Sequence, residues 1–451
     1  MVTLKGRLIL RLVLLPGLVI WIAPLLGGPA VELAYVNADL REELSGQVAS
    51  RKNTRVANNF AGADLGAKIN AADKDLGSTV GEILVRNGGT ISTQVVISPG
   101  HTLRFGPGTY RLATKLLWEG AFLLKSRTTV IGSGWDTIIV EPPRTGWIVF
   151  QSYEDIRTQP TGSSTDSDIT ITDLQIKGAN PAVEGSVRET LQMGNCHRCR
   201  VEHVWFNGTS VIGVQAGGNA LKGNFADTMT IKNNLFTRVA GQAVAVVNGR
   251  NIVIDGNTFK ESGRIGPKGV GMQGMTTIDV EPNTPNDIAQ RIEITNNVID
   301  SRGSTFLHGN GILVQNGAGT SGFGPVLIKG NTVIGGELVP NVSGNVATGI
   351  FVAAQAQDVT IIDNTVQRVA HSGIRLQNST RNYVANNKLI STGTGGINAF
   401  EIIDTTDSKI LNNVVAVDPK SPMGTSSIVV TGNSRNNVFK GNTNGRTSLD
   451  P

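Results

Sequence analysis

One short phrase recurs nine times after residue 170, and it restricts the folds open to this chain. Its copies combine alternating apolar residues with a small polar pair: ITDLQI (171–176), VEHVWF (201–206), IKNNLF (231–236), IDGNTF (254–259), ITNNVI (294–299), IKGNTV (328–333), IIDNTV (361–366), VANNKL (384–389) and ILNNVV (410–415). Its fourth position recurs at spacings of 30, 30, 23, 40, 34, 33, 23 and 26 residues. A unit of this size with strand-like alternation and no helical period predicts stacked β coils.

A second alternating segment follows the phrase in most coils. These segments cover residues 211–215, 243–247, 277–281, 312–315, 350–353, 374–377, 400–403 and 428–431. We expect their Ile and Val residues to point inward as an aliphatic ladder, Ile278 and Val280 among them. The asparagines at the turns should bond their copies about 4.8 Å away in the next coil. The predicted fold is an all-β, right-handed parallel β-helix solenoid.

The composition agrees with a chain that turns often. It has 55 glycines and 38 asparagines, and 30 of those asparagines lie between residues 201 and 450. Gly and Asn are the residues that turns with positive φ recruit. A helical bundle is therefore excluded. The length of 451 residues suits a solenoid, because each coil packs only on its neighbours.

The first 30 residues have the pattern of a secretory signal peptide. Lys5, Arg7 and Arg11 precede an apolar run over residues 12–26, and small residues end the segment at Ala30. An uncleaved membrane anchor is the alternative interpretation. We expect an exported protein, secreted or extracytoplasmic, with no other membrane association.

The remaining chain divides into four predicted parts. Residues 31–60 are interpreted as a linker, and residues 61–150 as an N-terminal cap with the first coils. Within that part, residues 61–76 carry Leu65, Ile69 and Ala72 at helical spacing and predict a helix that covers the open end. Residues 151–167 are interpreted as a polar loop, and residues 168–451 as the β-helix coils.

Charge gives little support for a nucleic-acid partner. The formal net charge is +5, and without the first 30 residues the chain has 37 basic against 35 acidic residues. There is no basic tail or arginine cluster, so nucleic-acid binding is not expected. An acidic polysaccharide would not be repelled.

The two cysteines, Cys196 and Cys199, stand in a C-x-x-C pair near His197 and His203. Such a pair is compatible with zinc or redox chemistry. No second C-x-x-C accompanies it, and Cys199 aligns with inward positions of other coils. A buried thiol or a short disulfide is the plainer interpretation.

Three N-terminal segments resemble the opening of the pectate-lyase-like right-handed parallel β-helix superfamily. They are GADLGAKINAA (62–72), GGTISTQVVISPGHTLRFGPGTYRL (88–112) and TVIGSGWDTIIV (129–140). The resemblance implies the fold. It does not select an activity, since the superfamily contains lyases, hydrolases, epimerases, phage tailspikes and proteins without a known reaction. The Asn-Thr-Asp of polygalacturonases, the Asp-Pro-His-Asp of alginate epimerases and the Arg-x-Pro-x-x-Arg of pectate lyases are all absent.

Asp279 and Glu281 are the first candidate catalytic residues. Both leave the outward face of the segment 277–281, and like charges at adjacent positions should raise one pKa. The coils around them are the longest, so we expect cleft walls from residues 260–275, 282–290, 316–325 and 335–348. The pair could also bind Ca²⁺. The alternative is a solvated acidic pair matched by Lys260 or Lys268.

His308 and Arg375 complete the predicted catalytic set. His308 lies just before a second strand, at the rim of the same face, and so does His371. Arg375 points outward, and its alternative role is an ion pair with Glu401 on the neighbouring strand. The predicted substrate-binding residues are Gln315, His371, Gln377 and Glu401. Apart from possible Ca²⁺, no cofactor is expected.

Two functional hypotheses from different classes remain open. The first is a secreted polysaccharide-active enzyme, either a glycoside hydrolase with two carboxylates or a lyase or epimerase. In the lyase or epimerase scheme, Arg375 binds a substrate carboxylate and His308 or His371 moves the proton. The second is a non-catalytic glycan-binding or structural protein of the cell surface.

Overall fold

The computed structural model describes residues 10–15, 18–22, 53–113, 120–141, 148–154, 165–178, 189–209, 211–217, 223–262, 275–302, 309–335, 348–393, 398–417 and 427–444. The chain forms two units, Met1–Asn53 and Thr54–Pro451. In the first unit, β1 (Leu10–Leu15) and β2 (Leu18–Ile22) pair antiparallel. Export through a signal peptide remains a prediction. None of the described helices is long and apolar enough to span a membrane.

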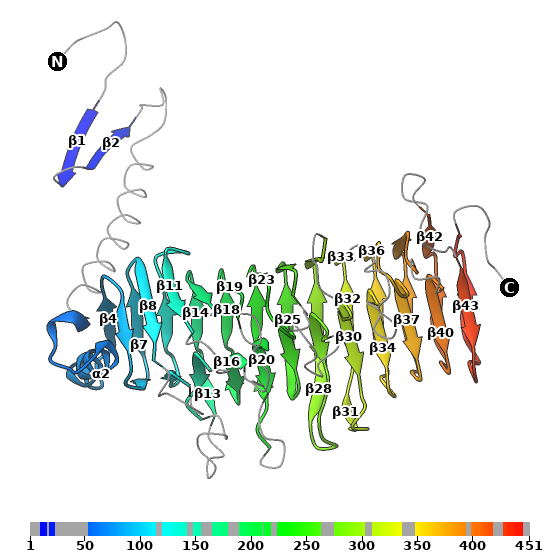
Figure 1. Ribbon diagram of the computed structural model, residues 1–451, viewed down its shortest axis with the longest axis horizontal. Helices are drawn as coiled ribbons and strands as arrows, with labels where there is room; N and C mark the ends of the chain where they lie inside the picture. Colours follow the sequence, from blue (N-terminus) through cyan, green and yellow to red (C-terminus); the bar gives the residue numbers. More distant parts are fainter. Residues whose placement is uncertain are drawn as a thin grey trace, which may run out of the picture. The chain divides into compact units, whose positions relative to one another are not determined.

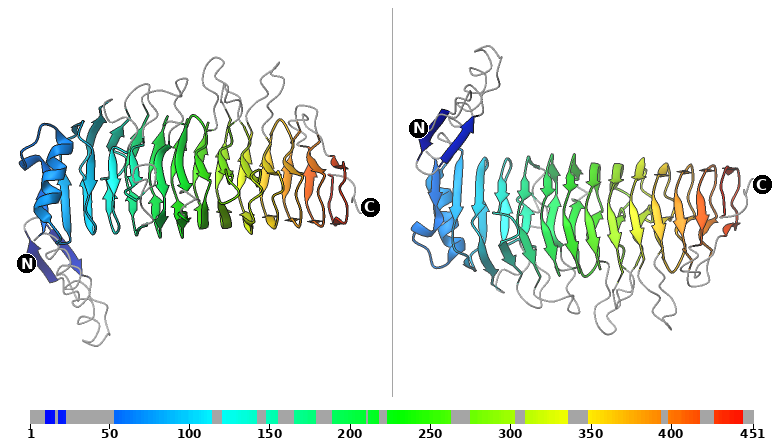
Figure 2. Two further views of the ribbon diagram at one scale, coloured as in Figure 1. Left: turned by 90° about the horizontal axis from the view of Figure 1, so that it is seen from below. Right: turned by 90° about the horizontal axis from the view of Figure 1, so that it is seen from above.

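The second unit is a solenoid of stacked coils with three parallel sheets, which confirms the predicted fold (Figures 1 and 2). We number the sheets in the order in which the chain visits them in each coil. Sheet 1 contains β3 (Thr54–Val56), β4 (Gly81–Val85), β7 (His101–Phe105), β10 (Thr129–Ile131), β13 (Asp166–Ser167), β14 (Thr170–Thr172), β17 (Cys196–His197), β18 (Arg200–Glu202), β21 (Ala226–Asp227), β22 (Thr230–Lys232), β25 (Gly249–Asp255), β28 (Ile288–Thr295), β31 (Gly322–Phe323), β32 (Val326–Lys329), β35 (Val359–Ile362), β38 (Tyr383–Ala385), β41 (Lys409–Leu411) and β44 (Val438–Lys440).

Sheet 2 contains β5 (Gly89–Ile91), β8 (Gly108–Leu112), β11 (Thr137–Val140), β15 (Gln175–Lys177), β19 (Trp205–Asn207), β23 (Leu235–Thr237), β26 (Thr258–Lys260), β29 (Val298–Asp300), β33 (Thr332–Ile334), β36 (Thr365–Gln367), β39 (Lys388–Ile390) and β42 (Val414–Ala416). Sheet 3 contains β6 (Val95–Ile97), β9 (Phe122–Leu124), β12 (Phe150–Ser152), β16 (Glu189–Gly194), β20 (Ile212–Gly217), β24 (Val244–Val246), β27 (Ile278–Val280), β30 (Ile312–Gln315), β34 (Ile350–Ala353), β37 (Ile374–Gln377), β40 (Phe400–Ile403) and β43 (Ile428–Thr431).

Each regular coil has three strands, whereas the sequence pattern suggested two. The repeated phrase contains a sheet 1 strand, a two-residue turn and a sheet 2 strand, as in β35 and β36. The second alternating segment is the sheet 3 strand. The first residue of the turn adopts positive φ, for example Asn296 at 55° and Asp363 at 58°. This conformation suits Asn, Asp and Gly and explains the small polar pair in the phrase.

The second residue of the turn forms the asparagine ladder that the sequence predicted. Its rungs are Asn234, Asn257, Asn297, Asn331, Asn364, Asn387, Asn413 and Asn442. At each step the Nδ2 donates to the Oδ1 of the next rung at 2.9–3.0 Å. The rungs are buried, and their bonds satisfy polar groups that the core would otherwise leave without partners.

The interior is filled by aliphatic and aromatic side chains in register from coil to coil. Ile278 and Val280 point into it with no exposed surface, as predicted. Phe206, Phe236 and Phe259 stack with ring centroids 4.5 and 4.8 Å apart. The coil-by-coil register therefore fixes which residues of sheet 3 face outward.

A helix covers the N-terminal end of the solenoid, where the sequence predicted one. It is α2 (Leu65–Leu76), and it buries Leu65, Ile69 and Ala72. Asp64 caps it by accepting from the N–H of Ala67 at 2.8 Å.

Two segments that the sequence predicted as a linker and a loop contain strand residues. β3 begins at Thr54, within the segment interpreted as a linker, and pairs with β4. The segment 151–167 starts within β12 and ends within β13.

Cys196 and Cys199 form a disulfide, with Cα atoms 6.0 Å apart. Both are buried, and Cys199 points inward as its alignment predicted. Of the two interpretations considered for this pair, the disulfide is the one found.

Candidate functional site

The outward column of sheet 3 carries three of the polar residues that the sequence singled out, Asp279, Arg375 and Glu401. In register it reads Leu123, Gln151, Gln192, Gln215, Ala245, Asp279, Leu313, Phe351, Arg375, Glu401 and Val429. Between Asp279 and Arg375 the column holds two apolar residues, Leu313 and Phe351. The candidate residues therefore form two separate groups, the acid pair (Asp279 and Glu281) and a second group around Arg375.

The acid pair is only partly open to solvent. Asp279 leaves the outer face of β27 but is 3% exposed, while Glu281 is half-buried just beyond the strand. Gln242 donates from Nε2 to Oδ2 of Asp279. Burial, and next the charge of Glu281, raise the pKa of Asp279 well above its ordinary value. The direction agrees with the predicted repulsion, but Asp279 is not the solvated carboxylate of the alternative interpretation.

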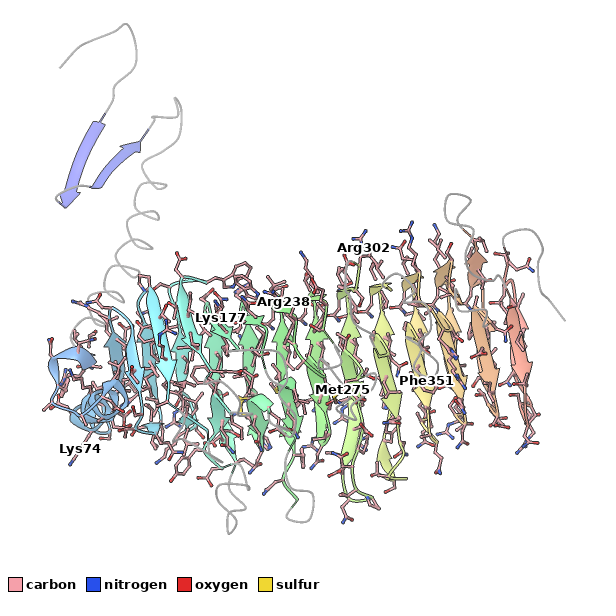
Figure 3. The ribbon with its side chains drawn as sticks, viewed as in Figure 1. Lys74, Lys177, Arg238, Met275, Arg302 and Phe351 are labelled. Atoms are coloured by element: carbon pink, nitrogen blue, oxygen red, sulfur yellow. A yellow bond between two sulfur atoms is a disulfide. The ribbon has the colours of Figure 1, made fainter. Side chains whose placement is uncertain are left out.

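The second group, the His371 cluster, comprises His371, Ser372, Arg375 and Glu401. His371 and Ser372 lie in the turn before β37, and Arg375 and Glu401 are neighbours across β37 and β40. Oε2 of Glu401 lies 3.6 Å from Nη1 of Arg375 and 3.7 Å from Nδ1 of His371. The ion pair considered as Arg375's alternative role is therefore present, with His371 added to it. Phe351, labelled in Figure 3, lies under Arg375, with its ring centroid 5.4 Å from Cζ.

Hydrogen bonds assign the proton of His371. The hydroxyl of Ser372 donates to Oε2 of Glu401 at 2.7 Å, so its oxygen is free to accept. Nδ1 of His371 lies 3.0 Å from that oxygen and is therefore the protonated nitrogen. Nε2 then offers its lone pair to Nη1 of Arg375 at 3.2 Å. The arrangement holds a neutral imidazole beside a fixed cation.

The electrostatics favour the same protonation state. The pKa of His371 lies below its ordinary value, and burial is the largest cause. The charge of Glu401 raises this pKa, and the charge of Arg375 lowers it. His371 is thus set to accept a proton at neutral pH. Arg375 retains a free donor, because its buried Nε has no hydrogen-bond partner among the described residues.

The two groups are too far apart to act on one bond. Asp279 and Arg375 stand three strands apart in the column, a separation of about 14 Å at the usual strand spacing. The structure therefore does not bring Asp279 and Glu281 together with Arg375, and a catalytic role for either group stays a prediction. His308, the remaining member of that set, lies outside the described residues.

A polar groove lies where the chain leaves sheet 3, at the other end of β37 from His371. We call it the turn groove, and its volume is about 870 Å³. It is lined by Asn316, Gly319, Thr320, Ser321, Gln355, Gln357, Gln377, Asn378, Ser379, Thr380, Asp404, Thr406, Asn433 and Arg435. Gln377, a predicted binding residue, lies in it, whereas Gln315 precedes its first lining residue.

Sequence reasoning missed Ser372 and most of the turn groove. A signal for Ser372 was present, since small polar residues precede successive sheet 3 strands: Thr276, Asn310, Thr348, Ser372, Asn398 and Ser427. The groove residues lie in turns that differ in length and composition from coil to coil. No repeated phrase marks them.

The predicted cleft walls are described only in part. Residues 263–274 and 336–347, and with them Lys268, lie outside the described residues. The predicted wall 282–290 is shorter than expected because β28 begins at Ile288, and β31 lies within the segment 316–325. In the part of the chain that the structure describes, no three His, Cys, Asp or Glu residues are grouped as metal ligands.

Comparisons with known proteins identify the architecture. Among solved structures, the A-module of the mannuronan C-5 epimerase AlgE4 from Azotobacter vinelandii is 15% identical, with a TM-score of 0.53 over 84% of this chain and 92% of that chain. The catalytic unit of a GH87 α-1,3-glucanase from Streptomyces thermodiastaticus is 12% identical, with a TM-score of 0.55 over 87% of this chain and 68% of that chain. At such identities the likeness shows the fold alone.

No curated protein matches the chain. A family model described as a right handed beta helix region matches residues 161–340 and 289–448. These matches together cover more than half of the sequence and coincide with the regular coils. The chain belongs to the right-handed β-helix family.

Proposed function

We propose that this protein is an enzyme that processes a uronate-containing polysaccharide by proton transfer at C5, as a lyase or an epimerase. The observation that carries the proposal is the neutral imidazole of His371, held 3.2 Å from the guanidinium of Arg375 on the outer face of sheet 3. A base beside a fixed cation is what removal of a proton next to a carboxylate requires.

Each member of the cluster has a role in this reaction. The substrate carboxylate binds Arg375, taking over the donors that now face His371 and Glu401. Nε2 of His371, released from Arg375, removes the C5 proton, and the electron pair is delocalised into the carboxylate that Arg375 stabilises. Glu401 and Ser372 position His371 and Arg375.

Two outcomes are open to the resulting anion. In a lyase the electron pair forms the C4–C5 double bond, and the glycosidic oxygen on C4 leaves with the proton that His371 took from C5 or with one from water. In an epimerase a proton from solvent adds to the opposite face of C5, and His371 releases the proton that it took to solvent. Support for a sugar polymer comes from the fold neighbours, since one is a mannuronan epimerase module and another an α-1,3-glucanase.

Hydrolysis at the acid pair is a second candidate, favoured by one observation. The pKa of Asp279 is raised while Glu281 lies two residues away, and a glycoside hydrolase needs one protonated acid near a second carboxylate. Against it stands the burial of Asp279, which is 3% exposed.

The experiment is a panel of uronate polymers and neutral glucans incubated with the protein in D₂O. Proton transfer at C5 predicts deuterium at that carbon, or an unsaturated product, with mannuronic, guluronic, galacturonic or glucuronic acid polymers. Hydrolysis gives new reducing ends without either signal. No reaction with the whole panel, together with binding of a polymer, would overturn the enzyme and favour the non-catalytic glycan-binding protein.

Variants assign the reaction to one group. His371→Ala and Arg375→Ala should each lower kcat/KM by about 100-fold or more. The matched controls are His203→Ala and Arg302→Ala, which change exposed residues on other coils. If Asp279→Asn abolishes turnover and His371→Ala does not, the reaction belongs to the acid pair.

We also propose that the protein is exported. The support is the signal-like N-terminus together with the Cys196–Cys199 disulfide, because oxidising compartments maintain disulfides. Cell fractionation and N-terminal sequencing test this, with a mature protein beginning near residue 31 expected. A cytoplasmic protein that retains residues 1–30 would contradict it.

A further inference from the structure

We infer that the turn groove binds the polymer on both sides of the reacting unit, so that the enzyme acts on internal units rather than on chain ends. This inference rests on the proposed function, because it takes the His371 cluster as the reacting centre. It adds the place where the rest of the polymer lies and the chemistry that holds it.

The position of the groove relative to β37 is the first argument. Its lining comes from turns that follow five successive sheet 3 strands, β30, β34, β37, β40 and β43. β37, the strand of Arg375, is the middle one. Two coil steps on either side extend the groove by about 10 Å in each direction along the solenoid axis.

The groove and the His371 cluster share one strand face. Arg375 and Gln377 lie two residues apart on β37, so their side chains leave the same face roughly 6.5 to 7 Å apart. Gln377 and the adjacent Asn378 line the groove. A sugar unit held on Arg375 therefore has its neighbours within reach of the groove.

The side chains available in the groove suit sugar hydroxyl groups. The side-chain amides of Gln355, Gln377 and Asn378 have no hydrogen-bond partner among the described residues, and they lie on two adjacent coils. Each amide offers two donors and an acceptor, whereas a hydroxyl both donates and accepts. The lining has one acid, Asp404, and one base, Arg435, so the units bound away from Arg375 are recognised through hydroxyls rather than charge.

The surrounding turns are fixed before any ligand binds. Asn316 bonds Thr320 in both directions, through the Thr320 N–H at 2.9 Å and the Thr320 carbonyl at 3.1 Å. Thr380 and Thr406 join neighbouring coils through their hydroxyls at 3.0 Å. A groove built on paired turns loses little conformational entropy on binding, which favours its use as a recognition surface.

The test uses a size-fractionated ladder of uronate oligosaccharides in D₂O, with mass spectrometry to locate the deuterium or the cleaved bond. Reaction confined to internal units is expected, together with a kcat/KM that rises with chain length until the groove is filled. Reaction only at one terminal unit would overturn the inference and leave the proposed function intact.

Groove variants provide the matched comparison. Gln377→Ala, combined with Asn378→Gly because Asn378 has a φ of 49°, should raise KM for long oligosaccharides about tenfold with little change for the shortest substrate. The control is Gln367→Ala on β36, a similarly half-buried amide on sheet 2. Equal effects of the groove variant on short and long substrates, or an equal effect of the control, would contradict the inference.

A binding measurement separates failure of the inference from failure of the function. His371→Ala is titrated calorimetrically with the same ladder. Length-dependent binding that the groove variant abolishes supports the groove even if the parent protein shows no turnover. Turnover by the parent, with binding unaffected by the groove variant, refutes the groove alone.

Discussion

The asparagine ladder should contribute more to stability than any single surface contact, and Asn331→Ala is the substitution that measures it. Nδ2 of Asn331 donates to the carbonyl of Ile294 at 2.8 Å and to Oδ1 of Asn364 at 3.0 Å. Its Oδ1 accepts from the backbone N–H and from Nδ2 of Asn297, at 2.9 and 3.0 Å. All these groups are buried.

Truncation to alanine leaves about three buried polar groups without a partner: two donors of Asn297 and the carbonyl of Ile294. At about 1–3 kcal/mol for each unsatisfied group, the expected loss is about 3–9 kcal/mol. The measurement is the urea midpoint followed by tryptophan fluorescence. Asn207→Ala is the control, because Asn207 is half-buried in a strand and its side chain only accepts from Arg238 and Thr237. A loss below about 1 kcal/mol for Asn331→Ala, or equal losses for both variants, would refute the reasoning.

Three further predictions concern ionisation and register. Arg375→Met removes a charge that lowers the pKa of His371, so this pKa should rise and the acidic limb of the kcat/KM profile should move to higher pH. A limb that does not move excludes His371 as the base. Burial raises the pKa of Asp166 to about 6. The raised pKa contributes about 3 kcal/mol to the free energy of unfolding below about pH 4, and this contribution is lost as the pH rises through 6. Asp166→Asn should therefore raise Tm near neutral pH and not near pH 4, and equal Tm changes would contradict this. Ile278→Asp should prevent soluble folding because it buries an unpaired charge, while Val298→Asp, at a 38% exposed position, should fold.

The sequence predicted the fold well because every coil repeats the same alternation of apolar residues and the same turn. Alternation fixed the inward face at Ile278 and Val280, and the polar pair marked the turn that holds the ladder. The number of strands in a coil was underestimated because only two residues separate the sheet 1 and sheet 2 strands. The repeated phrase therefore resembles one strand interrupted by a polar pair, although it contains the ends of two strands.

The site was less predictable because alternation gives the direction of a side chain and not what covers it. Asp279 points outward as expected, yet it is buried. Next to it, Val211, Ile212 and Ala245 form a small apolar cluster outside the main core. Contacts of this kind come from the turn before each sheet 3 strand and carry no repeat signal. For the same reason Ser372, which links His371 to Glu401, was not recognised.

The column of sheet 3 separates the groups that the two proposed chemistries would use. Hydrolysis would use Asp279 with Glu281, whereas Arg375 and Glu401 stand three and four strands from Asp279. Arg375 therefore cannot bind a substrate carboxylate for a reaction at the acid pair. It is adjacent to His371, which has a lowered pKa, and to Gln377 in the turn groove. His371 precedes β37, Arg375 lies on it and the turn groove follows it, so a single strand links the groups on which the proposed proton transfer depends.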